Sequence, residues 1–308
     1  MNEFEFIDTL KKIPLNNSIE LGIGDDCAVI QNKLICSDTL VENIHFKLDY
    51  FTTEQAIQKS IIVNLSDILA MNGIPEYYLM NLTVPKKRKD LNNISKAIEE
   101  INKKYKIDLI GGDTTSSEDL WVISVTMIGK SENPVFRKGA KENDFIYCGG
   151  FPGYSSFALN CLLNNIKNYE KYNKYHFLPE IDFNYLKLFK EININSMIDI
   201  SDGVLNDLRH ILKSSNKGAI INKNIFKEKD KDFFDNCKFL NINPFEHILN
   251  GGEDFIPLFT SNENPEIVQK TADKYNLNVI CIGKITDNTK NIVDENSEIL
   301  IPKGFIHF

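Results

Sequence analysis

The chain has 308 residues, a hydrophobic content of 42% and a formal net charge of −8. This length exceeds a usual single hydrophobic core and predicts two globular domains. The acidic balance argues against nucleic acid as a main partner, because non-specific binding to nucleic acid depends on Lys and Arg that neutralise phosphates.

The sequence also argues against a membrane and against an oxidising compartment. No stretch approaches the roughly 18 unbroken apolar residues of a membrane span, and the N-terminal MNEFEFIDTLKK lacks the basic-then-apolar order of a signal peptide. The six cysteines show no CxxC spacing, and a chain of this size does not need disulfides to fold. We therefore expect a cytoplasmic protein with reduced thiols and no membrane partner.

The first half of the chain is predicted to form a sheet with two helices. Thr52 and Gln55 form a T-x-x-Q capping box, which predicts a helix that ends near Met71. A second helix, capped by Asp90, is predicted to reach Tyr105, because its apolar residues recur at spacings of three and four. Strands are predicted at 34–37, 79–84, 108–110 and 120–129. The order is close to β-α-β-β-α-β, a ferredoxin-like pattern with both helices on one face of a sheet.

A polar stripe is predicted on the first of these helices. Ser60, Asn64 and Asp67 recur at i, i+4 and i+7 within a segment rich in Ile, Val, Leu and Ala. Such a stripe is either a solvated face or one wall of a site. The small side chains favour a site, since a solvated face more often carries Lys and Glu.

A loop around 131–135 marks a boundary between a first domain, 1–134, and a second domain, 135–308. Strands of the second domain are predicted at 144–148, 197–200, 219–221, 255–260 and 279–282. Helices are predicted at 155–163, 185–191, 204–214 and 265–275, and the polar segment 164–174 is expected to be a solvated loop. This mixture predicts an α+β domain.

Two glycines and two carboxylates meet between Gly22 and Asp26, in the sequence GIGDD. Glycine permits positive φ and close approach to a ligand, and carboxylate oxygens suit Mg²⁺. An acidic surface turn is the alternative, but recurrence favours a phosphate and metal site. Comparable polar motifs adjoin apolar runs at Ser37–Thr39, Asn64–Asp67, Gly111–Thr115, Asp199–Gly203 and Gly251–Asp254. Asp25 and Asp26 are neighbours whose side chains point apart in extended backbone, so we expect one of them to face the metal.

The motif DISDG is the second acidic centre. Asp199 and Asp202 bracket a tight turn just before a predicted helix, and a helix N-terminus favours phosphate. The alternative is an ordinary N-cap turn, for which Asp and Ser are favoured residues. Clustered carboxylates repel one another unless cations lie between them, so shared divalent metals explain the pattern economically.

Eight segments of the chain occur in the order and approximate spacing of thiamine-monophosphate kinases. They are LGIGDDCAVI, SDTLVENIHF, VNLSDILAMNGIPEYYL, LIGGDTTSS, RKGAKENDFIYCGG, IDISDGVLNDLRHI, GGEDF and KGFIHF. The chain thus resembles this kinase family over nearly its whole length. It resembles more distantly the superfamily of aminoimidazole ribonucleotide synthetase, selenophosphate synthetase and the hydrogenase maturation dehydratase.

The resemblance implies a two-domain homodimer of the aminoimidazole ribonucleotide synthetase-like fold, with an α/β N-terminal and an α+β C-terminal domain. It implies that ATP phosphorylates thiamine monophosphate to thiamine diphosphate with several Mg²⁺ ions. The implied metal ligands are Asp26, Ser37, Asp38, Asp67, Asp113, Asp199 and Asp202, of which Asp113, Asp199 and Asp202 are also the catalytic set. The implied ATP contacts are Gly112, Asp113, Arg137, Ser201 and Tyr105, and the implied thiamine monophosphate contacts are His45, Glu253 and Phe305. Two departures from the family are Pro302, where tryptophan can occur, and Cys36, which replaces a hydroxyl residue.

Alternatives stand beside this interpretation. The alternative for His45 is a structural residue that only makes hydrogen bonds. The alternative for Arg137 is a surface residue at the domain boundary. Another ATP-dependent enzyme of the superfamily would share the fold. Selenophosphate synthesis is disfavoured, because the sequence shows no evident N-terminal catalytic Cys or Lys motif. A non-catalytic nucleotide-binding protein is disfavoured because unneeded clustered carboxylates destabilise a fold. The acceptor in the kinase reaction is a phosphate oxygen, so neither a strong general base nor a phosphoenzyme is expected.

Overall fold

The computed structural model describes residues 3–87 and 91–303, and the chain divides into two units. The N-terminal unit contains residues 9–133 and 177–181, and the C-terminal unit contains the described residues of 1–8, residues 134–176 and those from 182 onward. Helix α1 (Glu3–Leu10) passes from the second unit into the first. The main division at 133/134 lies next to the predicted boundary, whereas residues 3–8 and 177–181 group with the opposite unit from the predicted one. Within the described ranges, no helix has both the length and the hydropathy to cross a membrane.

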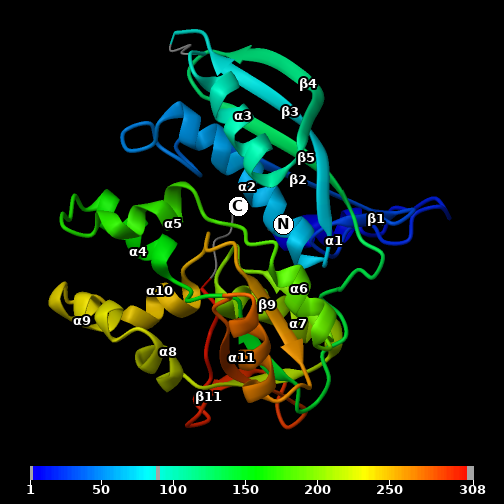
Figure 1. Ribbon diagram of the computed structural model, residues 1–308, viewed down its shortest axis with the longest axis vertical. Helices are drawn as coiled ribbons and strands as arrows, with labels where there is room; N and C mark the ends of the chain where they lie inside the picture. Colours follow the sequence, from blue (N-terminus) through cyan, green and yellow to red (C-terminus); the bar gives the residue numbers. More distant parts are fainter. Residues whose placement is uncertain (1–2, 88–90, 304–308) are drawn as a thin grey trace. The chain divides into compact units, whose positions relative to one another are not determined.

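The N-terminal unit is built on a five-stranded sheet with the order β1-β2-β5-β3-β4 (Figure 1). Its strands are β1 (Ala28–Ile30), β2 (Lys33–Val41), β3 (Ile74–Pro85), β4 (Asp108–Ser117) and β5 (Val122–Lys130). All neighbours are antiparallel except β3 and β4, which are parallel and joined by a helix. The element order after β1 is therefore β-α-β-α-β-β and not the predicted β-α-β-β-α-β, because one long strand separates the two helices and both remaining strands follow the second.

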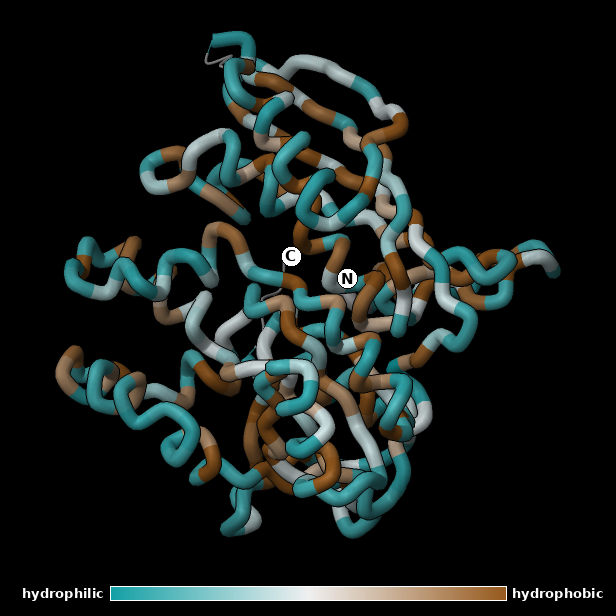
Figure 2. Tube along the Cα trace, viewed as in Figure 1, coloured by the Kyte–Doolittle hydropathy of each residue, from teal (hydrophilic) through white to brown (hydrophobic). Residues whose placement is uncertain are grey.

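Helix α2 (Thr53–Ala70) packs against β2, β5 and β3, and α3 (Ile94–Tyr105) packs against α2. The predicted capping box is confirmed: Thr52 Oγ1 accepts the Gln55 N–H, and Gln55 Oε1 accepts the Thr52 N–H. The helix-covered face of β5 is formed by alternate residues that are almost fully buried, as the period of two in a half-buried strand requires. Figure 2 shows largely hydrophilic colour on the outer turns of α3.

The start of α3 differs from its prediction. The predicted cap, Asp90, lies outside the described residues, and the helix begins at Ile94 after Asn93, whose φ is +63°. Leu91 precedes the helix and is 53% exposed, whereas Ile94, Ala97 and Ile101 are buried. Asn adopts the left-handed conformation more readily than most residues, so Asn93 can begin the helix at this point.

The C-terminal unit contains a six-stranded sheet with the order β11-β8-β10-β6-β9-β7. Its strands are β6 (Phe145–Cys148), β7 (Ser196–Asp199), β8 (Gly218–Ile221), β9 (Pro257–Ser261), β10 (Ile280–Thr286) and β11 (Ile292–Asp294). Its helices are α4 (Tyr154–Leu163), α5 (Asn173–Phe177), α6 (Tyr185–Glu191), α7 (Val204–Ser215), α8 (Asn224–Lys229), α9 (Lys231–Phe239), α10 (Pro244–Asn250) and α11 (Pro265–Lys274), with a 3-10 turn at Glu170–Tyr172. One core joins sheet and helices through residues such as Phe157, Leu208 and Ile282, each without exposed surface.

Several predictions for this half need correction. The segment 164–174 is not simply a solvated loop, because it holds the 3-10 turn and the start of α5, and Tyr172 is buried. Strand β10 continues past the predicted end at 282 and includes Gly283, where a bulge lies opposite β6. The strand near Phe255 begins only at Pro257. The short helices α8, α9 and α10 and strand β11 were not predicted, since their mixed polar sequences carry little periodicity.

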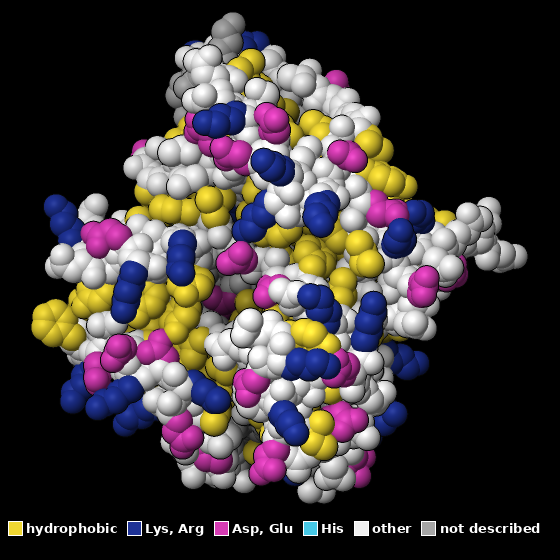
Figure 3. Space-filling view, viewed as in Figure 1, with side chains coloured by type: hydrophobic (Ala, Val, Ile, Leu, Met, Phe, Trp, Pro, Cys, Tyr) yellow, Lys and Arg dark blue, Asp and Glu magenta, His cyan; other side chains and the backbone are white. Residues whose placement is uncertain are grey.

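Charges of both signs are mixed on the face of the molecule that Figure 3 shows. Figure 3 shows Lys and Arg side chains interspersed with Asp and Glu on the face in view. This distribution agrees with a modest net charge of −8 and offers no basic stripe on that face of the kind that nucleic acid requires.

Gly112 in β4 is a position that only glycine can occupy without rearrangement. Its φ is +143°, and an added Cβ would lie 1.8 Å from the Met80 carbonyl oxygen. We expect Gly112→Ala to lower the free energy of unfolding by more than about 2 kcal/mol. Gly111→Ala is the matched control, because its Cβ would meet only the flexible end of Leu79 at 3.2 Å. Denaturant unfolding of both variants tests this, and equal midpoints would contradict it.

Candidate functional site

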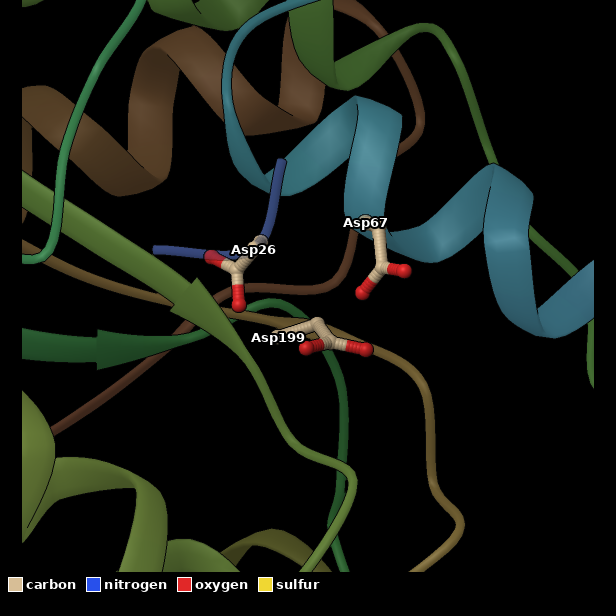
Figure 4. A group of neighbouring side chains, drawn as sticks. All are labelled: Asp26, Asp67 and Asp199. Atoms are coloured by element: carbon tan, nitrogen blue, oxygen red, sulfur yellow. The ribbon is translucent and has the colours of Figure 1, made fainter. Parts of the chain in front are cut away.

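Three carboxylates gather in the N-terminal unit from three different elements. Asp26 lies in the loop before β1, Asp38 on β2 and Asp67 in the last turns of α2. Carboxylate oxygens of Asp26 and Asp67 lie within 4.8 Å of each other, and Figure 4 shows Asp67 projecting from α2 on the side of the Asp26 loop. Asp199, also drawn in Figure 4, belongs to the other unit and is described with it below.

The pKa of Asp38 shows the cost of this grouping. Burial raises it most and the negative charge of Asp26 raises it further, while a hydrogen bond shared with Asp67 acts in the opposite direction. Carboxylates that share a site repel one another when all are ionised. A divalent cation among them would remove this cost, and an all-oxygen donor set suits a hard ion such as Mg²⁺.

The surroundings of the three carboxylates are held by α2. Asn64 Oδ1 accepts the Asp38 N–H at 3.2 Å, and Asn64 Nδ2 donates to the Ser60 carbonyl at 3.0 Å. Ser60 and Asn64 are 1% and 0% exposed, so the predicted polar stripe is not a solvated face. Of its three members, Asn64 and Asp67 are directed to the carboxylate group, whereas the Ser60 hydroxyl bonds to its own helix at Ile57.

Two thiols adjoin the carboxylates but are poor metal ligands. Cys27 and Cys36 donate from Sγ to the carbonyl oxygens of Asp67 and Asn64, each at 3.5 Å. Burial raises the pKa of Cys27 to about 11, with a smaller contribution from the nearby carboxylates. Burial also raises the pKa of Cys36, so without a metal both thiols stay protonated near neutral pH, and each is held by a backbone carbonyl group.

Two predicted ligands lie on the opposite face of the sheet. Ser37 pairs with Thr126, and their hydroxyls are 3.0 Å apart. Asp113 is exposed, and its neighbours across the strands are Asn81, Ser124 and Thr39. Asp38 instead lies beside the buried Val125, on the helix-covered face. Within the described N-terminal unit, Ser37 and Asp113 are thus not grouped with Asp26, Asp38 and Asp67.

Two other predicted residues of this unit make local contacts. Tyr105, at the end of α3, accepts the Ile181 N–H at its hydroxyl, 3.3 Å away. His45 Nδ1 accepts the Val41 N–H at 3.0 Å. This bond places the proton of a neutral His45 ring on Nε2, which then serves as a hydrogen-bond donor.

In the C-terminal unit, the DISDG turn is organised by a residue that follows it. Asp199 ends β7 and is 3% exposed. Asp207, in the first turns of α7, accepts the N–H groups of Ser201 and Asp202, both at 3.0 Å. Burial raises the pKa of Asp207, and the negative charges of Asp202 and Asp199 raise it further. The hydrogen bond from the Asp202 N–H and the positive charge of Arg137 lower this pKa. Arg137 thus acts electrostatically on this acidic cluster.

A short chain of polar contacts reaches Asp202 from α7. Arg209 Nη2 donates to Asn206 Oδ1 at 2.6 Å, and Asn206 Nδ2 donates to Asp202 Oδ2 at 3.3 Å. Asn206 is 3% exposed. The contacts hold the Asp202 carboxylate from the helix side, which agrees with a turn built to present carboxylates and not with a simple N-cap.

The GGED loop packs directly on this turn. An added Cβ on Gly252 would lie 2.3 Å from the Ser201 carbonyl oxygen. The Glu253 N–H donates to that same oxygen at 2.8 Å, and the φ of Glu253 is +64°. Glu253 Oε2 lies 3.2 Å from His176 Nδ1, while Asp254 accepts the N–H groups of Gly153 and Ser155 at the start of α4.

Sequence reasoning missed three residues of this unit that organise the site: His176, Asp207 and Asp254. Asp207 carried a signal, because it is an acid beside the apolar positions Leu205 and Leu208 of an amphipathic helix. Asp254 was part of a recognised motif but was given no role. His176 lies on α5, just beyond the segment 164–174 that is predicted to be a solvated loop, and no pattern in the sequence marks it. Phe305 lies outside the described residues.

Comparison with known proteins decides the family. Residues 24–131 match the family described as AIR synthase related protein, N-terminal domain. The chain is 34% identical to the thiamine-monophosphate kinase of Bacillus subtilis over 329 residues, covering all of both chains. It is 37% identical to that of Buchnera aphidicola subsp. Schizaphis graminum, covering 100% of this chain and 99% of the relative. The chain belongs to the thiamine-monophosphate kinase family.

A solved structure of this family matches the fold throughout. It is described as AaThiL complexed with AMPPCP and TMP, and it aligns with a TM-score of 0.85 and 28% identity, covering 100% of this chain and 97% of that one. The predicted family membership and the two-domain architecture with mixed helices and strands are therefore confirmed.

Asp254 makes the stability of the C-terminal unit depend on pH. Burial raises its pKa from 3.8 to about 7. The native state then holds a proton that the unfolded chain releases, so the free energy of unfolding falls as pH rises from about 4 to 7, by up to about 1.4 kcal/mol per pH unit. Asp254→Asn should lose this slope in urea unfolding without divalent cations. The exposed Asp235→Asn is the control, and parallel wild-type and Asp254→Asn curves would refute the assignment.

Proposed function

We propose that the chain transfers the γ-phosphoryl group of ATP to thiamine monophosphate, giving thiamine diphosphate and ADP. Full-length identity above 30% to thiamine-monophosphate kinases supports this reaction. The observation that carries the proposal is the half-buried grouping of Asp26, Asp38 and Asp67, whose repulsion has a function only if a cation is bound.

Mg²⁺ is the metal that this donor chemistry fits. Asp26, Asp38 and Asp67 are its proposed ligands in one unit, and Asp199 and Asp202 in the other. Ser37 and Asp113 stay predictions from the family resemblance, since their positions in the sheet do not support them. Bound Mg²⁺ supplies positive charge that offsets the charge of the transferring phosphoryl group and the repulsion between two anionic substrates.

The chain's own residues bind and orient the nucleotide. Arg137 offers a guanidinium that can pair with phosphate oxygens. Ser201 is the proposed second contact in the C-terminal unit. Gly112, Asp113 and Tyr105 are proposed contacts in the N-terminal unit. The missing side chain at Gly112 leaves room for the Met80 backbone of the neighbouring strand, so packing of the strands accounts for this glycine.

The acceptor is assigned to His45, Glu253 and Phe305. The Nε2 proton of His45 suits a phosphate oxygen, and the carboxylate of Glu253 suits the thiazolium charge or the aminopyrimidine N–H groups. The second pKa of a phosphate monoester is near 6, so the attacking oxygen is already ionised at neutral pH. Transfer is therefore direct and in line, without a general base and without a covalent enzyme intermediate.

One assay tests the function. The purified chain is incubated with ATP, Mg²⁺ and thiamine monophosphate, and the products are separated and identified. Thiamine diphosphate and ADP in equal amounts are expected. ATP hydrolysis without a thiamine product, or no nucleotide consumption at all, would overturn the proposal. All six cysteines are free, which fits the reducing cytoplasm that we propose as the compartment.

Asp67 is the sharpest test of the metal assignment. Asp67→Asn keeps the side-chain size but removes a charge from the proposed Mg²⁺ site, so we expect turnover to fall about a hundredfold or more at fixed Mg²⁺. Circular dichroism should show an unchanged fold. Asp119→Asn, which alters a carboxylate 67% exposed, is the matched control. Wild-type activity of Asp67→Asn at limiting Mg²⁺ would remove this residue from the site.

We also propose a homodimer formed through the sheet of the N-terminal unit. Across from its helix-covered face, this sheet presents hydroxyl residues of β2 and β5 together with Leu79, which is 38% exposed. The edge strand β4 adds Leu109 and Ile110, at 39% and 58%. Exposed apolar side chains on a sheet face and edge favour association with a second copy.

Leu79→Lys should therefore weaken the dimer, because it places a charge in an apolar contact. Sedimentation velocity at several protein concentrations would show a shift toward monomer. Leu163→Lys, at a leucine 52% exposed in the other unit, is the control and should not change the distribution. A monomeric wild-type protein, or an unchanged Leu79→Lys dimer, would contradict this interface.

A further inference from the structure

His176 is a buried histidine that faces a carboxylate. It lies on α5 and is 1% exposed, and its Nδ1 is 3.2 Å from Glu253 Oε2 and 3.3 Å from Ser155 Oγ. A buried polar ring is retained where it makes hydrogen bonds. An Nδ1–H that donates to the carboxylate satisfies Nδ1 and that carboxylate oxygen, and needs no net charge on the ring.

The main chain at Glu253 is fixed independently of this contact. Its φ of +64° is uncommon for a residue other than glycine. The Glu253 N–H donates to Ser201 O and the Phe255 N–H donates to Ile200 O, both at 2.8 Å. The backbone is therefore tied to the DISDG turn, and only the side-chain torsions of Glu253 remain to be set.

The contact with His176 sets those torsions. A glutamate side chain has three rotatable bonds and loses free energy when a ligand has to order it. His176 holds one carboxylate oxygen in advance, while the Glu253 side chain is 26% exposed, so part of it reaches solvent. This is the arrangement of a binding group whose orientation is fixed by a second side chain.

We propose that His176 is a positioning residue, which orients the Glu253 carboxylate toward the cationic or N–H-donating ring of the phosphate acceptor. The inference rests on the proposed function, because it assigns Glu253 to the acceptor and not to the nucleotide. His176 itself does not touch the reacting atoms. It acts on the affinity for thiamine monophosphate through Glu253 alone.

Two substitutions at His176 separate positioning from packing. His176→Leu fills much of the ring's volume but removes the donor, whereas His176→Asn keeps an N–H donor near the place of Nδ1. We expect His176→Leu to raise the KM for thiamine monophosphate about tenfold or more, with the KM for ATP and kcat within about twofold of wild type. His176→Asn should restore most of the loss.

A double-mutant cycle with Glu253→Gln shows whether His176 acts through Glu253. In the Glu253→Gln background, His176→Leu should change the KM for thiamine monophosphate by less than about twofold. Independent, multiplicative effects would overturn the inference, as would equal changes in both KM values or a loss confined to kcat. A wild-type chain that makes no thiamine diphosphate would instead overturn the proposed function, and the inference with it.

A measurement on the unmodified sequence covers the case in which His176→Leu does not fold. Protein labelled with ¹⁵N at histidine is titrated with thiamine monophosphate and, separately, with a non-hydrolysable ATP analogue. The His176 resonance, assigned with His176→Asn, should shift with thiamine monophosphate and stay nearly unchanged with the nucleotide. A shift with the nucleotide alone, or with neither ligand, would refute the role.

Discussion

Repulsion between carboxylates is the constraint on which the site depends. Asp26, Asp38 and Asp67 approach one another on one unit, and Asp199, Asp202 and Asp207 are electrostatically coupled on the other. Ionised groups at such spacing raise one another's pKa and destabilise the fold unless a positive charge or N–H donors face them. In each unit nearby polar groups offset part of this repulsion, and the proposed Mg²⁺ ions would offset the rest.

The two units use different local groups. In the N-terminal unit, Asn64 on α2 accepts from the Asp38 backbone, so the strand and helix that carry two of the carboxylates are joined. In the C-terminal unit, Asp207 accepts two N–H groups of the DISDG turn, and Asn206 donates to Asp202. In both cases a buried polar residue of a helix fixes the turn or strand that presents a proposed ligand. The helices are therefore part of the site as well as of the core.

The features predicted from sequence are those that depend on neighbours along the chain. The capping box at Thr52, the periodicity of α7 and the acidic motifs are local, and the structure has helices and turns at these places. The face on which Ser37 and Asp113 lie depends on strand register with β5 and β3, which no local pattern specifies. Short helices such as α8 and α10 depend on tertiary packing and give too few turns for a periodic signal.

The GGED motif contains two adjacent acids whose different roles could not be predicted from sequence. Glu253 and Asp254 are both acids, and the sequence gives no reason to separate them. The left-handed backbone at Glu253 directs its carboxylate to His176, while Asp254 turns to the N–H groups that begin α4. One acid is 26% exposed at the side chain and the other is a buried structural group. The proposed substrate contact and the contact with the start of α4 thus fall on neighbouring residues. Gly252 allows the loop to approach the DISDG turn at Ser201, and Gly251 allows it to approach His247 and Ser156.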